Sequence, residues 1–85
     1  MIGATWARVW RTGDKVGRFY VWRGVTTCGQ GFAWRRVDDG PVAGGPEWEC
    51  WLVDEQGRDI PGVLGGWLDW NPVNDPPVWD SFGIV

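Results

Sequence analysis

Histidine is absent from this sequence, and lysine and serine occur only once each, as Lys15 and Ser81. Histidine is the commonest general base and metal ligand near neutral pH, so its absence removes most familiar catalytic arrangements. The two cysteines, Cys28 and Cys50, make no zinc site by themselves. No D-x-D-x-D-G calcium loop is present either. The sequence therefore predicts a protein that is not an enzyme and that holds no metal or cofactor.

Long apolar runs are also missing. No stretch approaches the roughly 20 apolar residues of a membrane-spanning helix, and the opening MIGATWARVW lacks the charged and apolar regions of a secretory signal. We therefore expect no membrane partner and a location in the cytoplasm of a host cell or within a virion. In a reducing compartment both cysteines are expected to be free thiols, with Cys50 buried and Cys28 in an exposed turn.

Tryptophan, glycine and proline are plentiful, with nine Trp, 14 Gly and six Pro among 85 residues. Gly and Pro interrupt the chain so often that its longest uninterrupted stretches are 47–56 and 4–12. Helices average about 11–12 residues, whereas strands need only about 4–8. A Trp side chain can bury on the order of 200 Å², which compensates for the small core of a short chain. The pattern favours one all-β domain.

We predict a small antiparallel barrel or rolled sheet of five to six short strands, over 4–12, 15–25, 32–37, 47–53, 58–64 and 65–70. Gly13-Asp14 lies between the first two strands and is typical of a two-residue hairpin loop, which would place Trp10 opposite Gly17. Pro61 interrupts the fifth strand and suggests an edge or a bulge.

The segment 46–56 has an alternative interpretation as one short helix. Gly45-Pro46 and Gly57 resemble a helix start and stop, and Trp48 and Trp51 follow helical spacing. We favour a strand because VDEQGRDI is typical of a hairpin turn.

In a strand over 47–53 both faces carry large apolar groups. Trp48 and Cys50 would point one way and Trp51 the other, so each face needs a cover. We divide the chain into a compact β domain, 1–70, and a Pro-rich C-terminal tail or arm, 71–85. Trp79 and Phe82 in the tail are expected to pack on the domain's own sheet or on a neighbour.

Charge is divided unequally along the chain. Residues 1–36 carry a net charge of +6 and residues 37–85 a net charge of −9, which gives −3 for the whole chain. The asymmetry has two interpretations. Either the basic half binds a partner, or basic early strands lie beside acidic late strands and pair with them across the sheet.

Protein binding is the function that the sequence favours, because Trp, Tyr and Arg dominate interface energetics. The expected partner is another protein or the protein's own subunits. We expect a phage or mobile-element protein that binds a host protein complex stoichiometrically, as an inhibitor of the anti-defence type. A virion structural or decoration protein is the first alternative. Single-stranded nucleic-acid binding is the second, because basic and aromatic residues interleave over 6–36. The candidate interface residues are Trp22, Arg23, Trp34, Arg35, Arg36, Trp51, Trp79 and Phe82.

Overall fold

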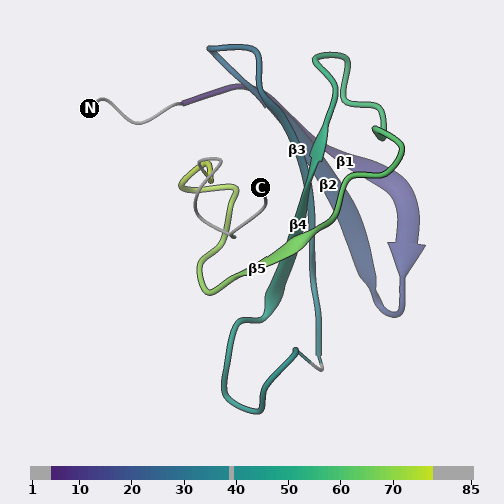
Figure 1. Ribbon diagram of the computed structural model, residues 1–85, viewed down its shortest axis with the longest axis vertical. Coiled ribbons are helices and arrows are strands. Elements are labelled where there is room, and N and C mark those ends of the chain that lie inside the picture. Colours follow the sequence, from purple (N-terminus) through teal and green to yellow (C-terminus); the bar gives the residue numbers. More distant parts are fainter. Residues whose placement is uncertain (1–4, 39, 78–85) are drawn as a thin grey trace.

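The computed structural model describes residues 5–38 and 40–77, and within them the chain forms one antiparallel sheet (Figure 1). Its strands, in spatial order as in sequence, are β1 (Trp6–Val16), β2 (Phe19–Thr26), β3 (Gly31–Arg36), β4 (Trp48–Val53) and β5 (Gly66–Leu68). The all-β prediction is confirmed, and so is the strand at 47–53. The alternative helix over 46–56 is wrong.

The sheet keeps β1 and β5 as its edges and is not closed into a barrel. No helix long and apolar enough to cross a membrane occurs in these described ranges.

The turn of the first hairpin lies closer to the C-terminus than the sequence predicts. Val16 pairs with Phe19, so the two-residue loop is Gly17-Arg18. Gly17 has a φ of 61°, the positive value that a type II′ loop needs at its first position and that glycine adopts without steric cost. The predicted loop at Gly13-Asp14 is therefore wrong.

Gly13-Asp14 instead belongs to an irregularity within β1. Between the pairs Arg11–Trp22 and Lys15–Tyr20, three residues of β1 face a single residue of β2. The Thr12 hydroxyl donates to the carbonyl of Val21 at 2.8 Å and accepts from the backbone N–H of Asp14 at 3.1 Å. This is a β-bulge closed by a side chain, and it places Trp10 opposite Arg23 rather than Gly17.

One face of the sheet forms the main core. Phe32, Trp34, Cys50, Leu52 and Leu68 are buried together there. The indole of Trp6 stacks on that of Trp34 with centroids 4.9 Å apart, and its Nε1–H donates to the carbonyl of Pro72 at 2.7 Å. The chain after β5 therefore returns across this face as its cover (Figure 1).

The opposite face is covered by the connection between β4 and β5. Arg23 donates to the carbonyl of Gly57 at 2.8 Å and to Asp59 at 2.9 Å. The indole N–H of Trp51 also donates to Asp59, at 3.3 Å. The predicted strand over 58–64 is wrong, because only an isolated bridge joins Asp59 to Val53. This connection covers the sheet face that carries Trp51, so each face of β4 has its own cover.

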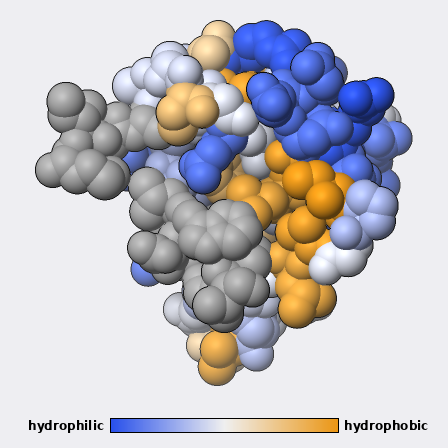
Figure 2. Space-filling view, turned by 45° about the horizontal axis from the view of Figure 1, so that its top comes forward, coloured by the Kyte–Doolittle hydropathy of each residue, from blue (hydrophilic) through white to orange (hydrophobic). Residues whose placement is uncertain are grey.

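Some apolar surface remains open. Figure 2 shows a broad apolar area bordered by hydrophilic residues. Among the large hydrophobic side chains described, Leu64 is 76% exposed, the highest value. Replacing it should leave the fold unchanged, which makes Leu64→Ala a suitable surface control.

Gly31 provides a test of the sheet's packing. A Cβ at this position would clash with the backbone carbonyl oxygen of Asp54 and lie 2.8 Å from that of Val53. Backbone atoms cannot rotate away, so we expect Gly31→Ala to cost about 2–3 kcal/mol, as overpacking does. The melting temperature, followed by circular dichroism, should fall by roughly 10 °C. Gly13→Ala is the matched control because its Cβ would meet no atom within 4 Å. Equal melting of the two variants would contradict the close approach of β3 to the chain after β4.

Candidate functional site

A groove of about 240 Å³ lies near the tip of the first hairpin. We call it the basic aromatic groove, and it is lined by Arg11, Arg18, Phe19, Tyr20, Trp22, Arg36 and Trp48. Arg11 lies directly opposite Trp22, and Arg36 directly opposite Trp48. Directly opposed residues share a sheet face, so these four side chains continue the core face beyond Trp34.

Cations stack on the aromatic rings of the groove. The guanidinium of Arg11 lies 4.4 Å and the ammonium of Lys15 5.2 Å from the ring centroid of Tyr20. Arg18 and Arg36 lie 5.1 and 5.9 Å from the ring of Phe19. Exposed contacts of this kind contribute about 0.5–1 kcal/mol each. Stacking uses the face of a guanidinium and leaves its in-plane N–H donors able to bind carboxylates.

Two of these four cations are already paired with acids. Arg18 contacts Asp38 at 2.7 Å, and Arg36 contacts Glu47 at 3.1 Å. Neither Arg11 nor Lys15 has a carboxylate within ion-pair distance in the described part of the chain. The groove therefore has an apolar floor, a rim of cations and an excess of positive charge.

Much of the charge asymmetry between the two halves of the chain is offset by ion pairs within the fold. Besides these two pairs, Arg23 contacts Asp59 and Arg35 contacts Glu49, both at 2.9 Å. All four pairs join a basic residue of 1–36 to an acid of 37–85. Pairing of basic early strands with acidic late strands across the sheet is confirmed for Arg35 of β3 and Glu49 of β4. The acids of the other three pairs lie in the β3–β4 and β4–β5 connections.

Asp59 fixes the β4–β5 connection to the second face of the sheet, and it does so as a carboxylate that accepts hydrogen bonds from Arg23 and Trp51. Hydrogen bonds from Arg23, and then from Trp51, lower the pKa of Asp59 below its usual value. The backbone N–H of Arg58 does the same for the pKa of Asp54 at the turn after β4. Both carboxylates therefore serve the local structure of this cover.

The predicted interface residues do not form a single surface in the structure. Trp22 and Arg36 lie together in the groove, whereas Trp34 is 1% exposed in the core. Three others lie on the opposite face, where Arg35 pairs with Glu49 and where Arg23 and Trp51 bind Asp59. Trp79 and Phe82 lie outside the described residues. The sequence-based candidates omit five groove residues, Arg11, Arg18, Phe19, Tyr20 and Trp48. For the four residues of the first hairpin, the predicted loop at Gly13-Asp14 gives the wrong cross-strand partners. Trp48 on β4 joins them only through the tertiary fold, where it lies opposite Arg36.

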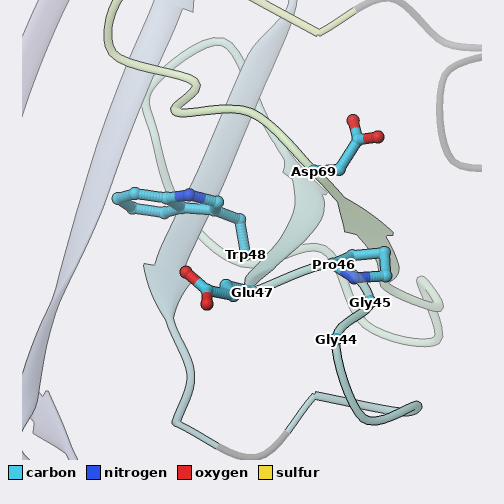
Figure 3. A pocket seen from close by; sticks show the side chains of 6 residues that line it. All are labelled: Gly44, Gly45, Pro46, Glu47, Trp48 and Asp69. Atoms are coloured by element: carbon cyan, nitrogen blue, oxygen red, sulfur yellow. The ribbon is translucent and has the colours of Figure 1, made fainter.

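A second hollow, of about 300 Å³, lies beside the β3–β4 connection and is lined by Gly44, Gly45, Pro46, Glu47, Trp48 and Asp69. Figure 3 shows the carboxylates of Glu47 and Asp69 well apart. Among the described residues, no group of three or more Cys, Asp or Glu side chains is placed to hold a metal ion. The basic aromatic groove is thus the better-defined candidate site.

Both cysteines are free, with Cys50 buried and Cys28 exposed, as predicted. Burial raises the pKa of the Cys50 thiol far above its ordinary value, so its reactive thiolate is suppressed. We expect a thiol reagent to modify Cys28 quickly and Cys50 only after unfolding, as read from the intact mass. The variant Cys28→Ser should not react while folded. A mass showing a Cys28–Cys50 bridge in freshly isolated protein would contradict this.

Comparison of the chain with protein-family models, curated proteins and solved structures finds no match. The groove's own residues are therefore the basis on which a function is proposed below.

Proposed function

We propose that the protein is a small non-enzymatic domain that binds another protein stoichiometrically through the basic aromatic groove. The observation that carries the proposal is the exposed ring of Tyr20, which lies beside the half-buried rings of Phe19, Trp22 and Trp48 and carries stacked cations. Tyr20 is 37% exposed and lies under two cations. Aromatic and arginine side chains supply most of the binding energy in protein interfaces, and a sheet holds them in place with little entropy left to lose.

Within this function we propose an inhibitor of a host protein complex, of the anti-defence type that phages and mobile elements encode. Its support is general: the domain is small and its distinctive surface is made of arginine and aromatic residues. A virion structural or decoration role is the alternative. It predicts that the protein co-purifies with particles, whereas an inhibitor is recovered with one host complex.

The experiment compares tagged wild-type protein with Arg11→Ala/Tyr20→Ala as baits in a host-cell lysate, with mass spectrometry of what each retains. The partner should then be purified and its stoichiometry measured by calorimetry. Binding should be lost in the groove variant and kept by Leu64→Ala, while all three proteins show the same folded circular dichroism spectrum. The groove variant should melt several degrees lower, because it loses the cation–π contacts of Arg11 and Lys15 on Tyr20. A partner that binds the groove variant as tightly as the wild type would overturn the proposal.

Nucleic-acid binding gives a separate prediction. The net charge of −3 opposes the long-range approach of a polyanion, and the described groove gathers four cations at one hairpin tip, which is a short track for a phosphate backbone. We expect no measurable binding of single-stranded DNA or RNA at physiological salt. Fluorescence anisotropy over a salt series checks this, because phosphate contacts give a steep salt dependence. A salt-sensitive signal that disappears in Arg35→Ala/Arg36→Ala would contradict the protein-binding proposal.

A further inference from the structure

The two acids that pair with the groove are built into its rim. Asp38 follows β3 and Glu47 precedes β4, so they lie at the two ends of one connection. The backbone N–H of Val37 donates to the carbonyl of Glu47 at 2.7 Å and closes the base of that connection. The fold thereby brings one carboxylate to Arg18 and another to Arg36.

These ion pairs are exposed and exchangeable. The side chains of Asp38 and Glu47 are 52% and 59% exposed. Exposed pairs of this kind contribute only about 0–1 kcal/mol, so a carboxylate from outside can replace either acid at little cost. Arg11 and Lys15 offer further donors that no described carboxylate occupies.

Resting on the function proposed above, we propose that the groove binds an acidic extended segment of the partner protein, and that Asp38 and Glu47 act as internal competitors. In the free protein these acids hold Arg18 and Arg36. On binding, carboxylates of the partner take over those arginines and bind Arg11, and an apolar side chain between them packs on Tyr20 and Trp22. The charge of the rim and the apolar floor together select this chemistry.

The test uses the full-length protein labelled with ¹⁵N and a short glutamate-rich peptide with one central phenylalanine. The same peptide with glutamine in place of glutamate is the ligand control. In an NMR titration the acidic peptide should shift the signals of Arg11, Tyr20 and the Trp22 indole, and the glutamine peptide should not. The variant Arg11→Gln should weaken binding by about fivefold, equivalent to about 1 kcal/mol.

Removing the internal competitors gives the decisive measurement. Asp38→Asn/Glu47→Gln should bind the acidic peptide about fivefold more tightly, because each exposed pair competes with up to about 1 kcal/mol. The matched control, Glu55→Gln/Asp75→Asn, removes the same charge from two exposed acids for which no ion pair is found in the described chain. Its affinity should equal that of the wild type.

Several outcomes would overturn the inference. These are equal gains in both double variants, a loss of affinity in Asp38→Asn/Glu47→Gln, no binding of the acidic peptide, or tighter binding of a single-stranded oligonucleotide than of the peptide. A different result would contradict the proposed function: a captured partner that binds Arg11→Ala/Tyr20→Ala as tightly as the wild-type protein. If the captured partner loses affinity for Arg11→Ala/Tyr20→Ala but binds Asp38→Asn/Glu47→Gln and the wild type equally, only the competition by Asp38 and Glu47 is contradicted.

Discussion

Replacement of Trp34 by alanine is expected to unfold much of the protein rather than to weaken a complex. Trp34 is the largest fully buried side chain in the described structure. Its ring stacks on Trp6 and packs in the cluster formed with Phe32 and Leu68. The strands around it are held by hydrogen-bonded pairing on both sides, because Trp22 and Cys50 lie directly opposite it. The surroundings can therefore collapse only partly into the space that the indole leaves.

The expected loss is about 3–5 kcal/mol, the usual cost of truncating a buried Trp to Ala. A chain of this length has a total stability of about 4–13 kcal/mol, at roughly 0.05–0.15 kcal/mol per residue. Trp34→Ala should therefore lower the melting temperature by more than about 12 °C, or leave no cooperative transition. Thermal and urea unfolding followed by Trp fluorescence measure this, with Leu64→Ala as the exposed control. If Trp34→Ala melts within a few degrees of the wild type, Trp34 is not the centre of the core.

The parts of the fold that the sequence predicts are those set by local pattern. Gly and Pro leave no room for long helices, and the alternation Trp48, Cys50, Leu52 against Trp51 and Val53 needs a strand between two covers. Burial of Cys50 and the single sheet follow from that pattern. Such features depend on residues that are neighbours in the chain, so they can be read without knowing the tertiary structure.

The first hairpin shows where local pattern stops being sufficient. Gly13-Asp14 is compatible with both a hairpin loop and a bulge, because both need a residue pair that tolerates unusual backbone. The decision is made by the Thr12 hydroxyl, which binds the Val21 carbonyl across the sheet, and by Gly17, which supplies the positive φ of the real turn. The cross-strand contact to Val21 is not visible in the sequence.

The groove was harder to predict than the core for a related reason. Trp22 and Trp34 lie directly opposite each other, so they share a face of the sheet. The two residues differ in their cover. Trp6 stacks on Trp34, and the segment after β5 contacts Trp6 through the carbonyl of Pro72. Trp22, nearer the hairpin tip, keeps some exposure beside Arg11 and Arg36. The assignment of one Trp to the core and the other to a surface depends on that long-range cover.

A chain that ends at Trp70 is expected to lose its cooperative fold. The next residues cover the core face: Pro72 and Pro77 are almost completely buried, and Val73 packs against the core cluster. Without them, the indole N–H of Trp6 loses its acceptor, the carbonyl of Pro72. The lost hydrogen bond costs about 1 kcal/mol, and each buried apolar side chain about 1.5 kcal/mol or more. The total approaches the whole stability of a domain of this size.

Two truncations separate the covering segment from the rest of the tail. Removal of 71–85 should give a species without near-ultraviolet circular dichroism that binds a hydrophobic dye, as loosely packed compact states do. Removal of 76–85 should keep the Trp6–Pro72 contact yet still lower the melting temperature, because it takes away buried Pro77 together with Trp79 and Phe82. The predicted packing of Trp79 and Phe82 lies outside the described residues and stays a prediction. If the shorter truncation melts like the full chain but no longer binds its partner, the end of the chain is an arm. If residues 1–70 alone melt cooperatively near the wild-type temperature, the segment 71–77 is no part of the core.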